Sequence, residues 1–236
     1  MGSLIIPGDE LHINKDSSVI QGPGVYCEPK SQRFIPVNAG IEMITDSKKG
    51  QTVYVDFNSR RYVPALGDLV VGTISGSFSD SYRVSLANFS TPVTLSYMAF
   101  PNASKKNRPT LKVGDLVYAR VSNAEKELEA EIECLDSTTG KDVGYGLLDG
   151  GFVVDISLAY ARELLFNSEF PLLHIIAKYT QFEVAIGVNG KVWIKCDDAK
   201  STLACYRSIV ECQSTPVGEY KRLIAANFKE ITNAME

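Results

Sequence analysis

The stretch "YVPALGDLVVGTISG", residues 62–76, decides the fold of the central part of the chain, because its middle recurs further on. "GDLVVGTI" at 67–74 returns almost unchanged as "GDLVYARV" at 114–121. In each copy the Gly-Asp pair favours a tight turn, and the apolar run after it favours a strand with one face in a core. We interpret the repetition as two strands of one domain that begin in the same way, not as a duplicated domain.

Strand patterns fill the segment from residue 62 to 148, with no long helical pattern among them. The predicted strands are "YVPALGDLVVGTISG", "SYRVSLAN", "TPVTLSYMAF", "LVYARVSN" and "ELEAEIECLD". Five strands in a segment of this length are typical of a small Greek-key barrel such as the OB-fold. Gly72 and Gly76, in the first strand, supply the bends that closing such a barrel requires.

The segments on either side differ in pattern. Residues 1–60 are short β-prone runs separated by Gly, Pro and Asn, which predicts a small N-terminal β domain. Residues 150–236 follow the order β-α-α-β-β-α of a KH-like domain, with a hairpin at Asn189-Gly190. The predicted fold is mostly β plus α+β, with an OB-fold barrel at 61–149 between these two domains.

Capping residues place the helices of the KH-like segment. Ser157 precedes "LAYARELLFN", and Pro171 stands where the first turn of the helix "LLHIIAKYT" tolerates proline. Ser201 is the predicted cap of "STLACYRSIVECQ", and "VGEYKRLIAANFKEIT" is predicted to form the last helix.

Charge and cysteine content exclude several classes of protein. A net charge of -4 rules out a protein that coats nucleic acid by bulk charge, so any contact with nucleic acid needs a local basic patch. The five cysteines form no C-x-x-C pair, which argues against a zinc ribbon and a disulfide framework. No apolar run is long enough to cross a bilayer. We expect no metal, no cofactor, no small-molecule substrate and no membrane association.

Catalytic chemistry finds little support in the residues. The chain has only two histidines, His12 and His174, and neither is paired with a nucleophile and an orienting group. Neither a Walker loop nor a Rossmann fingerprint is present. The pair Asp197-Asp198 is better placed to cap a helix than to hold a magnesium ion. The sequence predicts a protein that is not an enzyme.

Three stretches carry a resemblance to a known family: "RYVPALGDLVVGTI", "LSYMAFPNASKKNRPTLKVGDLVYARV" and "GVNGKVWIKC". They resemble the S1-KH cap subunits of the eukaryotic RNA exosome, and the resemblance covers essentially the whole chain. It implies an S1 barrel, a KH domain and a position on a ring of RNase PH-like subunits beside other cap subunits. The cap subunit that carries a zinc ribbon is excluded by the missing cysteine pairs. "SKKNRP" and "GVNG" favour one S1-KH subunit over its sister.

Basic residues gather in the loop "SKKNRP". Lys105, Lys106 and Arg108 can contact successive phosphates of single-stranded RNA, although a charged loop is often only a solvated surface. The resemblance favours RNA contact. A second basic pair, Arg60 and Arg61, stands at the start of the barrel, where it fits either RNA contact or contact between domains.

Aromatic residues near the first barrel hairpin are candidates for base stacking. We assign Phe78 and Tyr82 to this role, with barrel-core packing as the alternative. The usual S1 pattern, a glycine-rich stretch ending in His-x-Ser, is replaced here by "TPVTLSYMAF". Phe89 lies near the same hairpin and is not assigned.

The tetrapeptide "GVNG" resembles the RNA-clamping G-x-x-G loop of KH domains but lies in the wrong place. That loop joins two helices, whereas Gly187, Asn189 and Gly190 join two strands, and the helix connection "NSEFPL" has no glycine. We interpret these three residues as a structural hairpin in which Asn189 and Gly190 adopt positive φ. Trp193, the only tryptophan, either packs on the barrel or marks a subunit interface.

Alternating carboxylates in "EKELEAEIECLD" predict an acidic strand face made of Glu127, Glu129, Glu131 and Glu133. This face suits solvent or a basic partner better than a metal ion.

Two functions remain open at this point. The resemblance implies a non-catalytic exosome cap subunit that helps guide RNA to a 3′-5′ exoribonuclease for RNA decay and rRNA processing, in the nucleus, the nucleolus and the cytoplasm. The alternative is a stand-alone OB-fold module that binds RNA or a protein, for example in translation.

Overall fold

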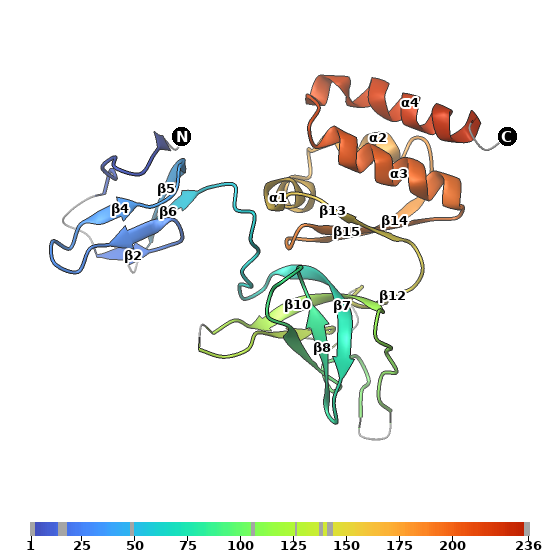
Figure 1. Cartoon of the computed structure of the whole chain (residues 1–236), viewed down its shortest axis with the longest axis horizontal. Coiled ribbons are helices and arrows are strands. Elements are labelled where there is room, and N and C mark those ends of the chain that lie inside the picture. Colours follow the sequence, from blue (N-terminus) through green and yellow to red (C-terminus); the bar gives the residue numbers. More distant parts are fainter. Residues whose placement is uncertain are drawn as a thin grey trace. The chain divides into compact units, whose positions relative to one another are not determined.

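The structure, a computed structural model, describes residues 3–13, 18–47, 50–104, 107–125, 127–136, 139–140 and 144–233. The chain divides into two compact units, Met1–Ser59 and Arg60–Glu236 (Figure 1). The predicted fold class is confirmed: an N-terminal domain, a five-stranded S1 barrel and a KH α+β domain. No described helix is both long enough and apolar enough to span a bilayer.

The N-terminal unit is a small β structure. Its sheet has the order β1-β5-β6-β2, and a separate pair is formed by β3 and β4. The strands are β1 (Leu4–Ile5), β2 (Val19–Gln21), β3 (Val25–Cys27), β4 (Phe34–Pro36), β5 (Gly40–Ser47) and β6 (Gly50–Asp56). Its core is thin and is built on four buried side chains: Ile5, Val25, Val53 and Val55.

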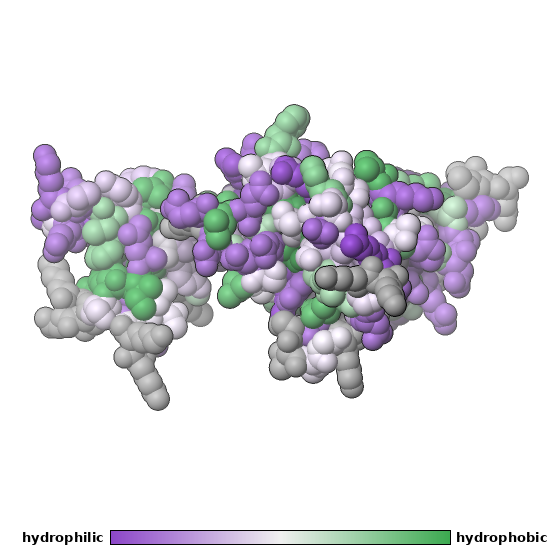
Figure 2. All heavy atoms as spheres, turned by 90° about the horizontal axis from the view of Figure 1, so that it is seen from below, coloured by the Kyte–Doolittle hydropathy of each residue, from purple (hydrophilic) through white to green (hydrophobic). Residues whose placement is uncertain are grey.

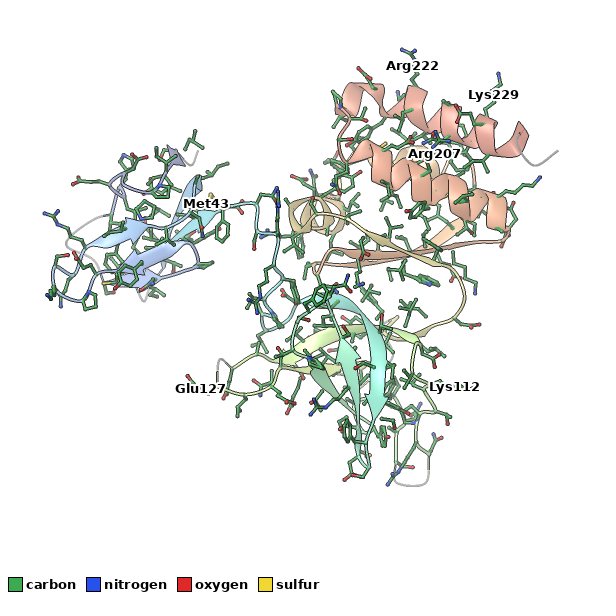
Figure 3. All side chains as sticks on the ribbon, viewed as in Figure 1. Met43, Lys112, Glu127, Arg207, Arg222 and Lys229 are labelled. Atoms are coloured by element: carbon green, nitrogen blue, oxygen red, sulfur yellow. The ribbon has the colours of Figure 1, made fainter. Side chains whose placement is uncertain are left out.

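The outer face of this sheet carries exposed apolar side chains. Leu4 lies opposite Ile41, and Met43 follows on the same side of β5, so the three side chains share one face. All three are exposed, Leu4 to 80%. Apolar side chains are visible on the surface of this unit in Figure 2, and Figure 3 labels Met43. A sheet face of this kind is typical of a contact surface for another protein.

Glu42 is a buried carboxylate that joins the N-terminal strands. It is 4% exposed and accepts hydrogen bonds from Ser3 Oγ (2.9 Å) and the His12 main-chain N–H (2.7 Å). The His12 ring nitrogen Nδ1 lies 2.7 Å from Glu42 Oε2. Burial by itself raises the pKa of Glu42, but the bonds from His12 and Ser3 outweigh burial, so the pKa lies below its ordinary value of 4.5.

Acid is therefore expected to loosen the N-terminal sheet. A lowered folded-state pKa contributes stability that is present above pH 4.5 and is lost as the pH falls through the folded pKa. Amide hydrogen exchange on the full chain should show the β5 and β6 amides opening more readily near pH 4 than near pH 6. Glu42→Gln should weaken protection at neutral pH and flatten this dependence, while Glu10→Gln, on an exposed side chain, should change neither. A pH dependence that survives in Glu42→Gln would assign it to another group.

The barrel forms one sheet with the order β11-β9-β8-β7-β10-β12, closed by the additional pairing of β11 with β10. The strands are β7 (Leu69–Ser77), β8 (Ser81–Ser85), β9 (Val93–Ser96), β10 (Leu116–Asn123), β11 (Glu131–Glu133) and β12 (Gly146–Leu148). Its interior is filled by fully buried aliphatic side chains, among them Ile74, Leu95 and Ile132. Five strands close the barrel, and β12 extends the sheet beyond β10.

The repeated Gly-Asp pairs form the same turn twice. Gly67 and Gly114 have positive φ values of 88° and 99°, which glycine adopts without strain. Asp68 accepts a bond from the main chain of Ala65 (3.1 Å), and Asp115 accepts the matching bond from Lys112 (2.7 Å). The two strands that follow, β7 and β10, pair antiparallel. The repetition therefore starts two neighbouring strands from opposite ends of the barrel.

Two features of the barrel differ from the prediction. The run "ELEAEIECLD" is a strand only at Glu131–Glu133, and β12 was not predicted. Glu127 and Glu129 precede β11, and Glu133 bonds to Arg120 (3.1 Å), so the four carboxylates do not form one strand face. Figure 3 shows Glu127 on a loop that points away from the barrel.

The KH domain has a three-stranded sheet in the order β13-β15-β14. Its elements are β13 (Phe152–Asp155), α1 (Leu158–Phe166), α2 (Pro171–Ile176), β14 (Phe182–Gly187), β15 (Lys191–Cys196), α3 (Ala199–Cys212), the 3-10 helix η1 (Val217–Glu219) and α4 (Tyr220–Asn233). Figure 1 shows the helices on one side of the sheet and the barrel on the other. Ser157 caps α1 as predicted, whereas α3 is capped by Asp198 and not by Ser201.

Asn189 joins the KH hairpin to the barrel. Its Nδ2 donates to the carbonyls of Val71 (2.8 Å) and Leu86 (2.7 Å), and its Oδ1 accepts from the N–H of Val71 (3.2 Å). A Cβ on Gly187 would lie 2.6 Å from the same Val71 nitrogen, so only glycine fits there. Gly190 has a φ of 80°, but Asn189 does not have positive φ, which corrects the predicted turn geometry.

Trp193 lies in the same junction. It is 5% exposed and packs with Val71 and Ala185, while its Nε1–H donates to the carbonyl of Gly150 (2.8 Å). Of its two predicted roles, packing against the barrel is the one that the described residues show. Trp193 and Asn189 belong to the junction between the barrel and the KH domain, which lie in one compact unit.

Candidate nucleic-acid interface

Arginine and aromatic side chains meet at the turn between β7 and β8. The guanidinium carbon of Arg83 lies 5.2 Å from the ring centre of Phe78, and that of Arg108 lies 5.7 Å from the ring centre of Tyr97. Arg108 also donates to the carbonyl of Ser79 (3.2 Å), and the Tyr97 hydroxyl donates to the carbonyl of Phe78 (2.5 Å). We call Phe78, Arg83, Tyr97 and Arg108 the arginine–aromatic cluster.

The chemistry of this cluster suits single-stranded nucleic acid. Phe78 is 55% exposed, so a face of its ring is open to a base. Guanidinium groups contact phosphates and stack on bases, and aromatic rings stack on any base without selecting its sequence. Glu129 lies 3.8 Å from Arg83, but both side chains are exposed, so this ion pair is weak.

The loop "SKKNRP" reaches the same turn through Arg108. Lys105 and Lys106 lie outside the described residues. Ser104 and Asn107, on either side of them, exchange main-chain hydrogen bonds of 3.0 and 3.1 Å. The structure therefore places one of the three predicted cations, Arg108, in the cluster.

Tyr82, predicted to stack on RNA, is instead a core residue. It is 3% exposed, and its hydroxyl donates to the carbonyl of Pro109 (2.6 Å) and accepts from the N–H of Leu111 (3.0 Å). Its ring packs edge-on against Tyr97, with 4.5 Å between the ring centres. Tyr82 therefore packs against one ring of the cluster and bonds to the main chain of the residues after Arg108. Its ring is not available to a base.

Tyr97 and Arg83 were missed by the sequence analysis, although a signal was present. Tyr82 and Val84 alternate with Arg83 along β8, and the alternation places Arg83 on the outer face. Tyr97 directly follows β9, which lies beside β8.

Arg60 and Arg61 lie away from the cluster. Both are exposed, and the neighbouring Tyr62 donates to Asp68 at the start of β7 (2.7 Å). Phe78 follows the other end of β7. A nine-residue strand spans about 26 Å, so the pair and the cluster are not one site.

The helix connection in the KH domain lacks the features of an RNA clamp. Asn167, Ser168, Glu169 and Phe170 join α1 to α2, and none is glycine. The side chain of Asn167 bonds to Glu163 (2.9 Å), and the His174 ring lies 3.2 Å from the carbonyl of Ser168. His174 thus contacts this connection and has no nucleophile beside it among the contacts of the described chain.

Metal ligands do not cluster in the described part of the chain. No group of three His, Cys, Asp or Glu side chains there could hold an ion. The five cysteines are free thiols.

Family models match three successive parts of the chain. The model described as "Exosome complex component RRP40, S1 domain" matches residues 62–146, and a KH-domain model matches residues 151–200. The model described as "Exosome complex exonuclease Rrp40 N-terminal domain" matches residues 19–61. Exosome complex component RRP40 of Saccharomyces cerevisiae is 55% identical over 239 residues, which is 100% of each chain. The chain belongs to the Rrp40 family of exosome components.

Relatives of lower identity carry the same family name. The Rrp40 protein of Schizosaccharomyces pombe is 35% identical over 89% of this chain and 88% of its own, and human RRP40 is 28% identical over 95% and 90%. A solved structure titled "Crystal structure of putative exosome complex RNA-binding protein" covers 75% of this chain and 99% of its own, with a TM-score of 0.59 at 22% identity. This likeness supports the fold alone.

Membership of the Rrp40 family favours the exosome cap subunit over the stand-alone OB-fold module. Rrp40 proteins are non-catalytic cap subunits with S1 and KH domains, so the expectations of an exosome subunit and of a protein that is not an enzyme are confirmed. Between the two S1-KH subunits, the choice that the sequence favoured is also confirmed.

Proposed function

We propose that this chain binds single-stranded RNA through the arginine–aromatic cluster together with Lys105 and Lys106, as a cap subunit that helps guide RNA to a 3′-5′ exoribonuclease. The observation that carries the proposal is the convergence of Phe78, Arg83 and Arg108 on one turn of the barrel. Lys105 and Lys106 precede Arg108 in the sequence, which adds two positive charges to the same loop. The proposed RNA surface does not include Tyr82, which is buried, or Arg60 and Arg61, which lie near the other end of β7.

The proposed partners are RNase PH-like ring subunits and other cap subunits. The apolar face formed by Leu4, Ile41 and Met43 supports a protein contact for the N-terminal domain. Relatives named as exosome components support the assembly. We place the protein in the nucleus, the nucleolus and the cytoplasm, in RNA decay and rRNA processing. The functional division that we propose is 1–60, 61–149 and 150–236, in line with the unit boundary after Ser59.

The basic loop is expected to carry a large part of the RNA affinity. In the assembled complex, changing Lys105, Lys106 and Arg108 to alanine should weaken binding of a single-stranded RNA by at least about tenfold at moderate salt. The dependence of log K on log salt should become shallower by about 2, since each lost phosphate contact on a single strand removes about 0.7.

A matched control removes the same charge elsewhere. Lys221, Arg222 and Lys229 are exposed on α4, where Figure 3 labels Arg222 and Lys229 pointing outward. Changing these three to alanine should leave the affinity and the salt slope unchanged, and both variants should assemble normally on size exclusion. An equal loss of RNA affinity in the two variants would show that only the net charge matters, and it would contradict the proposed surface.

Purification tests the proposed partners. The chain should co-purify with RNase PH-like subunits and bind RNA weakly by itself. A monomer that binds RNA tightly in the absence of partners would contradict the proposed dependence on the assembly.

A further inference from the structure

Two thiols of the KH domain lie in contact at the end of β15. Cys196 is the last residue of β15, Cys205 lies on α3, and their Sγ atoms are 3.7 Å apart. The main-chain N–H of Cys196 donates to Thr202 Oγ1 (3.2 Å), which holds the strand end against the helix. A disulfide needs about 2 Å between the sulfur atoms, so they must approach by about 1.7 Å. Rotation of the two side chains about their Cα–Cβ bonds can supply this displacement.

The two thiols differ in their access to solvent. Cys196 is half-buried, whereas Cys205 is fully buried. Burial, together with the neighbouring Cys196 and Asp198, raises the pKa of the Cys205 thiol. A small oxidant from the solvent therefore reaches Cys196 first, and Cys205 is the thiol that reacts second. The contact between the two sulfur atoms favours this second step through proximity, although the raised pKa slows it.

The other three cysteines do not belong to this pair. Cys212 follows Cys205 by almost two turns of the same helix, about 10 Å along its axis, which is too far for a disulfide between them. Cys134 lies in the barrel core, where its Sγ is 3.6 Å from the carbonyl of Tyr118. Cys27 lies on β3 of the N-terminal unit. The contact therefore singles out Cys196 and Cys205.

We propose that Cys196 and Cys205 form a reversible disulfide when the protein meets hydrogen peroxide. The peroxide transfers one oxygen to the Cys196 sulfur, which becomes a sulfenic acid, and one water molecule is released. The Cys205 sulfur then attacks the Cys196 sulfur, and the S–O bond breaks. The leaving hydroxide takes the Cys205 proton and departs as a second water molecule. In sum, two thiols are oxidised to a disulfide and one peroxide is reduced to water.

This disulfide fixes the end of β15 to α3. A reducing compartment keeps such a pair as thiols, so the bond forms during oxidation and is reversed by small thiols. Cys196 and Cys205 are close in the sequence, so the closed loop is short and the gain in stability is moderate. We expect the oxidised chain to melt about 3–8 °C above the reduced chain. Both thiols pack in the KH core, so this site is independent of the proposed RNA surface.

Peptide mapping of the full chain tests the pair directly. The protein is treated with hydrogen peroxide, the remaining thiols are blocked with N-ethylmaleimide, and trypsin is added without a reductant. Cleavage after Lys195, Lys200 and Arg207 places the two cysteines in the separate peptides 196–200 and 201–207. We expect these peptides to be joined, at the sum of their masses less two hydrogen atoms. Dithiothreitol should separate them again.

Variants assign the rise in melting temperature to this bond. Cys196→Ser, at a half-buried position, should remove both the joined peptide and the rise that peroxide causes. Cys205→Ala should do the same, and Cys196→Ser remains decisive if this buried change prevents folding. Cys27→Ser, at a half-buried position of the N-terminal unit, is the matched control and should keep both signals. A rise that persists in Cys196→Ser would assign it to another thiol.

Three results would overturn the proposal. The first is a peroxide-treated chain in which N-ethylmaleimide still blocks both Cys196 and Cys205. The second is a Cys196 that is oxidised to the sulfinic acid while Cys205 stays a thiol. The third is a bond that forms only between two copies of the chain, seen as a dimer on a non-reducing gel.

Discussion

Asn189→Ala is expected to lower the free energy of unfolding of the barrel–KH unit by about 3–5 kcal/mol. Asn189 is 6% exposed, and the truncation leaves the N–H of Val71 and the carbonyls of Val71 and Leu86 without their partner in a buried junction. Each buried polar group left unsatisfied costs about 1–3 kcal/mol. Asn189→Asp should be at least as damaging near neutral pH, because a carboxylate cannot donate to the two carbonyls.

Chemical denaturation of the full chain measures this effect. Asn88→Ala, at an exposed position in the β8–β9 loop, is the matched control and should change stability by less than about 0.5 kcal/mol. RNA affinity of the folded fraction of Asn189→Ala should stay the same, since Asn189 faces the barrel and not the cluster. A stable Asn189→Ala protein with selectively lost RNA binding would contradict the structural role.

Trp193→Ala is expected to cost about 3–5 kcal/mol as well, the usual range for truncating a large buried aromatic side chain. The indole is buried between the KH sheet and the barrel, so its loss leaves a void among Val71, Tyr118 and Ala185. The bond from Nε1–H to the carbonyl of Gly150 is lost with it. The barrel and the KH domain should then unfold less cooperatively.

Calorimetry tests the coupling between the two domains. Wild type should give one transition for the barrel–KH unit, and Trp193→Ala should lower and broaden it. Trp193→Phe keeps a ring but loses the bond to Gly150 and part of the packing of the indole, so it should cost less than Trp193→Ala, about 1–2 kcal/mol. Phe166→Ala, at a 71% exposed position, should change little. If Trp193→Ala melted like wild type but failed to assemble, Trp193 would be an interface residue.

Local chemistry explains why much of the fold could be predicted from the sequence. The Gly-Asp turns depend on a positive φ at Gly67 and Gly114 and on one carboxylate each, all within four residues. Ser157 and Pro171 mark helix starts in the same local way. The β-α-α-β-β-α order followed from such signals and is confirmed.

The misses arose where closure of the barrel, not local pattern, decides the outcome. The alternation along β8 favours Tyr82 and Val84 on the inner face, but only the pairing of β8 with β7 and β9 shows that Tyr82 is buried together with Val84. β12 is three residues long and exists because β10 offers it a pairing edge. Arg83 and Arg108 come together only in the closed barrel, far apart in sequence.

The bonds of Asn189 have a mechanical consequence. They reach two different barrel segments, at Val71 and at Leu86, so the barrel cannot swivel about the hairpin as it could about a single pivot. A protein that binds the KH helices would therefore also fix the direction in which Phe78 and Arg108 point. Loosening this joint should change the direction of the cluster relative to the KH helices, while the affinity of the cluster for RNA stays the same.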